Sequence, residues 1–208
     1  IFHKKESSLP SAPILPAPPV PAIPATAAIS PLPEQPEKNI APEKTPEPLL
    51  GAISIKHRLT LWRILDDIYG DNGVEARRQI ILANPRIKDI GKIAESAVIQ
   101  VPLIMDRARP IPPGTILVSL QSGNDLEPLY YSFIERKDQP GMPGLLFLSF
   151  WNKREGKKFV VVLNKRFTST QAAQEAISRL PLEFAVSAKI MSDWDGDTVC
   201  FNRKLAGI

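Results

Sequence analysis

Between residues 51 and 104 the apolar positions predict a strand, two helices and a second strand. Residues 52–56 alternate between apolar and polar side chains and contain β-branched residues, as in a short strand. In the helix expected next, apolar residues recur at helical spacing, at Leu61, Ile64, Leu65 and Ile68. Thr60 is a good N-cap for this helix, and Gly70 is a typical residue for its end.

A second helix is predicted over residues 74–83, because Asn84 and Pro85 end the helical pattern there. We expect three of its side chains to face inward: Val74, Ile80 and Ile81. Residues 97–102 predict the closing strand. The segment 51–104 therefore predicts a small βααβ unit.

Residues 115–202 predict a larger unit with a different order. Strands are expected at 115–122, 145–151, 157–163 and 184–194, with 152–156 as a hairpin turn; helices are expected at 124–137, capped by Asn124, and at 168–181, capped by Thr168 or Ser169. The order β-α-β-β-α-β is the split βαβ pattern, which gives one four-stranded antiparallel sheet with both helices on one face. The predicted fold class is α+β, and we expect the other face of the sheet to be free for a ligand.

The remaining segments lack such patterns. Residues 1–50 hold thirteen of the 22 prolines and a single aromatic residue, so they carry too little apolar surface to offset the entropy of folding. We expect a disordered, extended, Pro/Ala-rich linker there, with a proline-rich ligand for a partner domain as the alternative reading. Residues 105–114 predict a short proline-rich hinge, and residues 203–208 predict a tail.

Composition narrows the setting only a little. The formal net charge of +4 permits acidic partners without requiring them. The single cysteine, Cys200, excludes an internal disulfide and a cysteine-rich metal site. Because the chain has no run of about 18 apolar residues, we expect any membrane anchor to lie upstream of Ile1.

Three motifs follow one another within residues 53–102: TLWRILDDIYGD, ILANPRIKD and IAESAVIQVP. They resemble the helix-opening motif, the Asn-Pro motif and the final Pro of LysM domains, which bind glycans containing N-acetylglucosamine, above all peptidoglycan. The resemblance implies a shallow groove between the loop before the first helix and the loop after the second. Carried over residue by residue, this groove involves Arg58, Leu59, Thr60, Asn84, Pro85, Arg86 and Ile87. Arg58 and Leu59 stand where the family usually has Gly-Asp.

Two stretches of the second unit, ILVSLQSGND and KKFVVVLNKRFTSTQAAQEAISRLP, resemble the two halves of a SPOR domain. The likeness spans about residues 115–191. SPOR domains bind peptidoglycan glycan strands that have lost their peptides. On the predicted sheet, the candidate glycan contacts are Ser119, Gln121, Ser122, Phe150 and Asn164.

Together the two resemblances imply a non-catalytic region that binds peptidoglycan glycan strands without a cofactor. The order of linker and modules is similar to the envelope-side tail of a larger bacterial protein, for example a secretion-system ATPase. We therefore expect a periplasmic location, a tether to the inner membrane through an upstream segment, and envelope-complex proteins as further partners. A protein–protein interaction region of a secretion or envelope complex is one alternative.

A nucleic-acid-binding module is the second alternative, because RNA recognition motifs share the βαββαβ order. A basic run would suit phosphate groups, at Lys153, Arg154, Lys157, Lys158, Lys165 and Arg166. The predicted first strand, however, lacks the aromatic residue on which such modules stack a base. Nucleic acid is therefore not expected as a partner.

The string SDWDGDTVCFN places Asp193, Asp195 and Asp197 around a glycine, as a cation-binding loop would. The same letters also fit a two-residue type I′ turn at Asp195-Gly196 between two strands, which is our interpretation. No metal site is therefore expected.

The sequence contains no Ser/His/Asp pattern, and no metal-ligand spacing. A glycosidase with paired carboxylates would have to use residues such as Asp66, Asp67, Glu127 or Glu135. We expect the protein not to be an enzyme.

Overall fold

The computed structural model describes residues 48–56 and 59–207, so the expected linker falls largely outside the described residues. The chain is an α+β protein with two antiparallel sheets, as predicted. In the first sheet, β1 (Leu49–Ser54) pairs with β2 (Val98–Pro102). Between them lie α1 (Leu61–Tyr69) and α2 (Val74–Ala83), which confirms the βααβ order. The first strand begins at Leu49, three residues before the predicted start.

Local signals fix both ends of α1. The Thr60 hydroxyl accepts a hydrogen bond from the Arg63 backbone N–H, as an N-cap does. Gly70 ends the helix with a φ of 78°, a left-handed conformation that favours glycine. A Cβ at this position would lie 2.5 Å from Oδ1 of Asn202, so the close approach of the C-terminal segment also requires glycine.

The inward face of α2 is narrower than predicted. Ala76 and Ile80 are buried, but Val74 is 78% exposed and Ile81 is 39% exposed. The predictions for Val74 and Ile81 were therefore wrong: α2 packs mainly on β2 and α1, and these two side chains are left on its exposed side. The predicted end of the helix at Asn84 is confirmed.

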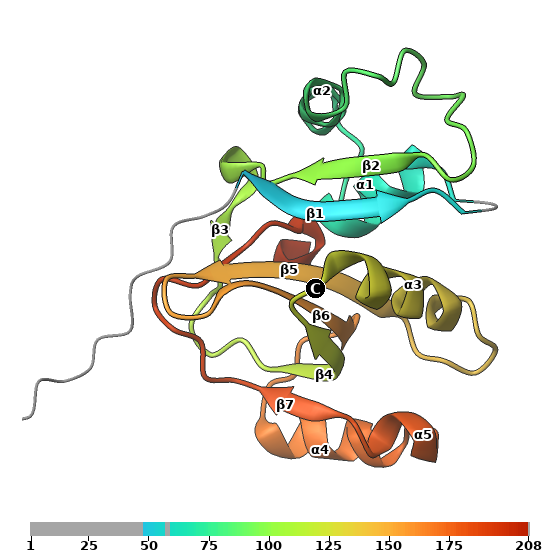
Figure 1. The fold of residues 1–208 in the computed structure, drawn as a ribbon. Helices are drawn as coiled ribbons and strands as arrows, with labels where there is room; N and C mark the ends of the chain where they lie inside the picture. The colour runs from blue at the N-terminus through green and yellow to red at the C-terminus, as the bar shows by residue number, and fades with distance from the viewer. Residues whose placement is uncertain (1–47, 57–58, 208) are drawn as a thin grey trace, which may run out of the picture. The chain divides into compact units, whose positions relative to one another are not determined.

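The second sheet has six strands in the order β3-β8-β5-β6-β4-β7. Their bounds are β3 Arg109–Pro110, β4 Leu117–Gly123, β5 Leu145–Asn152, β6 Gly156–Leu163, β7 Lys189–Met191 and β8 Val199–Cys200. The run β5-β6-β4-β7 is antiparallel throughout, and it is the order that the split βαβ pattern requires. The predicted four-stranded sheet is therefore confirmed, and two short strands extend it beside β5 (Figure 1).

Helices cover one face of this sheet. They are α3 (Leu126–Lys137), α4 (Thr170–Ser178) and the short α5 (Leu182–Ala185). Ser169 caps α4 through a hydrogen bond from Ala172 N, as predicted, but the N-cap of α3 is Asp125 rather than Asn124. Alternate residues of β4, β5 and β6 form a second apolar cluster on the opposite face, which we call the helix-free face.

Three expectations for the chain ends of the second unit were wrong. The hinge 105–114 contains a 3-10 helix, η1 (Met105–Arg107), and β3, which joins the sheet. The final strand is short because α5 takes up the start of the stretch 184–194. The Asp195-Gly196 hairpin does not form, because β7 pairs with β4 whereas β8 pairs with β5 and β3.

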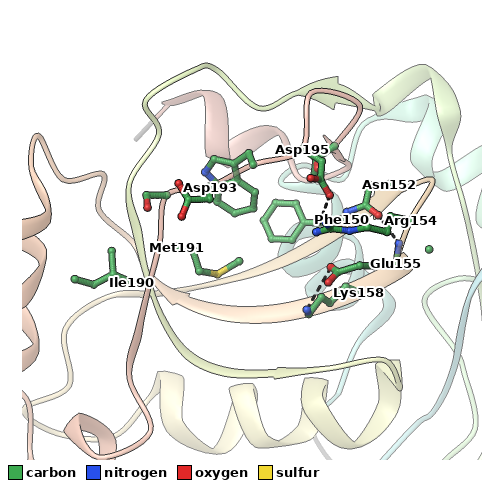
Figure 2. A pocket seen from close by; sticks show the side chains of 13 residues that line it. Phe150, Asn152, Arg154, Glu155, Lys158, Ile190, Met191, Asp193 and Asp195 are labelled. Carbon is green, nitrogen blue, oxygen red and sulfur yellow. Dashed lines mark hydrogen bonds and ion pairs between the residues drawn. The ribbon is translucent and has the colours of Figure 1, made fainter. Parts of the chain in front are cut away.

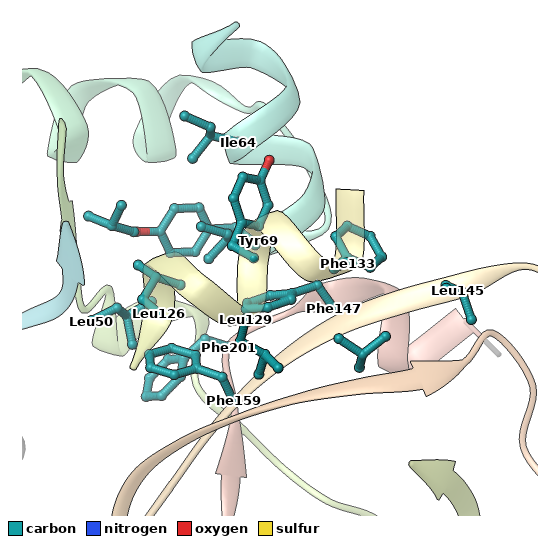
Figure 3. Close-up of a cluster of buried hydrophobic side chains, with 14 of the residues drawn as sticks. Leu50, Ile64, Tyr69, Leu126, Leu129, Phe133, Leu145, Phe147, Phe159 and Phe201 are labelled. Atoms are coloured by element: carbon teal, nitrogen blue, oxygen red, sulfur yellow. The ribbon is translucent and has the colours of Figure 1, made fainter. Parts of the chain in front are cut away.

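One hydrophobic cluster joins the segments that the sequence divides into two modules. Ile64 and Tyr69 of α1 belong to the same cluster as Phe133 of α3 and Phe147 of β5 (Figure 3). The Phe147 ring lies 5.5 Å from the Tyr130 ring, 5.6 Å from Phe133 and 6.0 Å from Phe159, centroid to centroid. The βααβ segment therefore packs on the helix-bearing side of the second unit.

Buried polar groups join the same two segments. The Asp67 carboxylate of α1 accepts hydrogen bonds from Lys137 Nζ at 2.5 Å and from the Tyr130 hydroxyl at 3.2 Å. Asn202 donates from Nδ2 to the carbonyl oxygens of Asp67 at 2.8 Å and Phe147 at 2.9 Å. The predicted tail is a further part of this junction, since in η2 (Arg203–Gly207) Lys204 pairs with Asp66 of α1 and Arg203 pairs with Asp71.

Candidate functional site

The segment between β7 and β8 forms a cavity on the helix-free face. Because these strands lie on opposite sides of β4, β6 and β5, residues 192–198 must cross the sheet to connect them. Trp194 packs on the apolar cluster of that face, with its ring 5.1 Å from the Phe150 ring. The segment and the β5–β6 hairpin enclose a cavity of about 250 Å³ (Figure 2). The face that we expected to be free is therefore partly covered.

Trp194 is held in place at both ends. Its indole Nε1 donates to the carbonyl oxygen of Thr115 at 2.7 Å, and its ring contacts Phe150. Phe150 is only 4% exposed, whereas Trp194 keeps part of its surface open. The cavity therefore has an aromatic wall in a fixed orientation.

Four of the five charged groups that line the cavity are paired with one another, and the fifth, Asp193, is exposed. Arg154 forms an ion pair with Asp195 at 3.1 Å, and Lys158 forms one with Glu155 at 3.4 Å. Figure 2 shows both pairs at the edge of the cavity. Asn152, Ser192 and Thr198 add uncharged polar groups to the lining. The site therefore combines an aromatic wall with polar groups and nearly balanced charge.

The three aspartates of the crossing segment have separate surroundings. Asp195 binds Arg154, Asp197 accepts a hydrogen bond from the Lys153 backbone N–H at 2.9 Å, and Asp193 is exposed. Among the residues that the structure describes, no group of three or more His, Cys, Asp and Glu side chains could hold a metal ion. Asp195 and Asp197 hold the crossing segment against the β5–β6 hairpin.

The LysM-like candidates fall into exposed and structural residues. Arg58 lies outside the described residues. Thr60, Pro85 and Arg86 are exposed, while Leu59 and Ile87 are half-buried against the core. Asn84 is buried: its Nδ2 donates to the carbonyl oxygens of Ile80 and Gln100, and its Oδ1 accepts from Gln100 N. Its side chain therefore joins the end of α2 to β2.

The SPOR-like candidates do not come together at one place. Phe150 lines the cavity, and Ser119 is buried in β4. Gln121 faces α3, where its Oε1 accepts from Ser132 Oγ at 2.7 Å and Arg136 at 2.9 Å. A register irregularity between Ser119 and Gln121 explains why their side chains face opposite sides. Ser122 is exposed, and Asn164 lines a different cavity beside residues 141–144.

Sequence reasoning missed Trp194 and the pairing of Arg154 with Asp195. The basic run and the aspartate string were each noted as a charged pattern, and contact between them was not considered. Their opposite charges were the signal that could have suggested it. Lys157 Nζ donates to the carbonyl oxygen of Leu49 at 3.3 Å, and Arg166 donates to that of Leu205. Much of the basic run is thus used within the protein, which does not favour the nucleic-acid alternative.

The carboxylates considered for a glycosidase lie on α1 and α3, away from this cavity. Asp66 binds Lys204 at 2.7 Å, Asp67 is buried against Lys137, and Glu135 is exposed. The backbone N–H of Ser54, with the Ser54 side chain, donates to Glu127 and lowers the pKa of that carboxyl below its ordinary value. A lowered pKa keeps Glu127 ionised and unsuited to act as a general acid near pH 7.

Cys200 is expected to be unreactive in the folded protein. It is 2% exposed, and burial raises the pKa of its thiol to about 12, although backbone hydrogen bonds from Asn202 and Phe201 oppose this. Because the thiolate is the reactive form, alkylation at pH 8 should be more than about 100-fold slower in buffer than in denaturant. Mass spectrometry of the alkylated protein measures this, and equal rates in the two conditions would contradict it.

Comparisons with protein-family models, curated proteins and solved structures returned no match. In the described part of the chain, no helix has the length and apolar character needed to cross a membrane.

Proposed function

We propose that the chain is a non-catalytic peptidoglycan-binding region of a larger bacterial envelope protein, with a LysM-like segment followed by a SPOR-like segment. Two features of the fold support this reading. The first segment has the βααβ order, and the second has the split βαβ order with helices on one face. Both orders are those that the resemblances in the sequence require. Fold alone does not define function, so the proposal depends on the cavity.

The observation that carries the proposal is the cavity beside Trp194. Ligand sites combine an apolar surface with a few placed polar groups, and a sugar ring presents both kinds of surface. Its C–H face can pack on the open part of the Trp194 ring, and its hydroxyls can bond to Asn152, Ser192 and Thr198. The ion pairs leave little net charge at the lining, which fits an uncharged polar ligand such as a glycan without its peptides.

The LysM-like segment would supply a second, weaker contact. Thr60, Pro85 and Arg86 are exposed on the loops that the resemblance assigns to the groove. Two weak sites on one chain raise the overall affinity, because the second contact is intramolecular. In this proposal both sites act in the periplasm, where peptidoglycan lies.

Sedimentation with purified peptidoglycan tests this function. We expect the protein to pellet with sacculi, and to pellet better after amidase has removed the peptides. Ser192→Trp fills the cavity and should raise the Kd for sacculi at least about tenfold, the equivalent of about 1.4 kcal/mol. Ser178→Trp is the matched control, because it adds the same ring at an exposed position on α4.

Two results would overturn the proposal. One is the absence of pelleting at low salt with both intact and amidase-treated sacculi. The other is equal binding by the two tryptophan variants, which would move the glycan site away from the cavity. Salt-dependent binding to single-stranded RNA would favour the nucleic-acid alternative instead.

A further inference from the structure

Three arginines surround a second cavity on the helix-free face. It has a volume of about 310 Å³ and lies between β3, β8, η2 and the loop after β6. Arg109 belongs to β3, Arg166 to that loop and Arg203 to η2. The described lining contains no aspartate or glutamate. The residues around the cavity thus carry three positive charges and no negative one.

Within the described part of the chain, Arg109 and Arg166 bond to backbone carbonyl oxygens rather than to acidic side chains. Arg109 donates to the backbone carbonyl oxygens of Asp106 at 2.9 Å and Ala108 at 2.8 Å. Arg166 donates to the carbonyl oxygen of Leu205, and within the described residues its buried Nε has no hydrogen-bond partner. Carbonyl oxygens accept hydrogen bonds from these two guanidinium groups but carry no full negative charge. The positive charges of Arg109 and Arg166 therefore remain uncompensated by these contacts.

Among the residues that the structure describes, the acidic partner of Arg203 is Asp71, which Arg203 shares with Arg107. The Arg203 guanidinium lies 3.3 Å from Asp71, but the same carboxylate oxygen lies 2.8 Å from the buried Arg107. Hydrogen bonding to Arg107 is the main reason why the pKa of Asp71 is below its ordinary value. One carboxylate therefore serves two guanidinium groups, and the cavity remains positive.

The floor of the cavity is apolar. Cys200 is 2% exposed and Leu205 is 4% exposed, and Pro110 and Pro112 add ring surface. Charges that line a concave, partly dry surface create a stronger potential than charges spread over a convex one. The planar guanidinium group also matches the geometry of carboxylate and phosphate oxygens.

We propose that this cavity binds an organic oxyanion, a phosphate or carboxylate group carried on an apolar body. The oxyanion lies among Arg109, Arg166 and Arg203, and the apolar body covers Cys200 and Leu205. The buried Nε of Arg166 gains a partner when the anion enters. The inference is independent of glycan binding, because it uses none of the residues that line the cavity beside Trp194.

Titration of the full chain with small probes tests the ligand class. Phenyl phosphate and benzoate carry both the oxyanion and the apolar body. Inorganic phosphate carries only the oxyanion, and benzyl alcohol carries only the apolar body. The measurement is calorimetry together with the amide resonances of residues 166 and 202–205. We expect saturable binding of at least one organic anion in the millimolar range or tighter, and binding at least about tenfold weaker for the other two probes.

Variants locate the binding. Arg109→Gln and Arg203→Gln change exposed arginines, and each should weaken binding of the organic anion about tenfold. Arg78→Gln is the matched control, since it removes one exposed positive charge from α2, which has no part in either proposed site, and should leave the affinity unchanged. Thermal melting of each variant verifies that it is folded.

Three outcomes would count against the inference. Lack of saturation with both organic anions overturns it, as does equal weakening by all three variants, which would indicate general attraction of anions. Inorganic phosphate binding as tightly as phenyl phosphate would refute the role of the apolar floor. Preference for phenyl phosphate or for benzoate supports the inference and identifies the phosphate or the carboxylate as the anion.

Discussion

Replacing Asp67 with alanine is expected to lower the free energy of unfolding by about 3 kcal/mol, the lower end of the range for breaking a buried ion pair. The Asp67 side chain is 2% exposed and lies 2.5 Å from Lys137 and 3.7 Å from Arg63. Its removal leaves both cations and the Tyr130 hydroxyl without their shared acceptor. Lys137 and Arg63 are each 32% exposed, so water offsets part of the loss.

Urea unfolding followed by circular dichroism measures this loss. Asp138→Ala is the matched control, because Asp138 also binds Arg63, at 2.8 Å, but is 67% exposed. An exposed ion pair contributes at most about 1 kcal/mol. If the two variants lost equal stability, the buried position of Asp67 would have no special energetic role.

Phe147→Ala should cost about 3–5 kcal/mol, the usual range for truncating a fully buried phenylalanine. The side chain is 0% exposed and touches aromatic rings from both α3 and β6. Because α1 also packs on β5, the cavity left by the ring weakens the contact between the two segments. We therefore expect amide hydrogen exchange to become faster in α1 and in β6 together.

Leu182→Ala is the control for this truncation, since Leu182 is 79% exposed on α5. Its expected effect is below about 0.5 kcal/mol. Faster exchange in β6 alone after Phe147→Ala would mean that the LysM-like segment is stabilised independently of the second unit.

Elements with strong local signals could be predicted from the sequence. The first helix has apolar residues at helical spacing, a side-chain cap at Thr60 and a left-handed glycine at its end. The fourth helix likewise has its Ser169 cap. The split βαβ order follows from the sequence of strands and helices, because chain connectivity leaves few ways to arrange them. Local chemistry and connectivity therefore account for most of the fold.

The errors concern partners that are distant in the sequence. Asp195-Gly196 has the composition of a hairpin turn, but pairing of β8 with β5 and β3 prevents a hairpin with β7. A turn signal specifies a change of direction and does not identify the strand to which the chain returns. Val74 was expected inside because helical spacing cannot reveal how wide a face the neighbouring elements cover.

The candidate site was less predictable for the same reason. Of the five sheet residues considered as glycan contacts, only Phe150 lines the cavity beside Trp194. The other wall comes from the crossing segment, which depends on the misjudged pairing of β8. Asn84 was matched to a binding motif, but its three hydrogen bonds show a structural role that a motif cannot distinguish from binding.

The two ends of the six-stranded sheet have a consequence for the behaviour of the protein at high concentration. One outermost strand, β3, has two residues and includes Pro110, which lacks an amide hydrogen. The other, β7, has three residues and begins with the exposed Lys189. Short strands, proline and lysine at such positions hinder the addition of a foreign strand. The six-stranded sheet should therefore resist edge-to-edge pairing even when many copies gather on one surface.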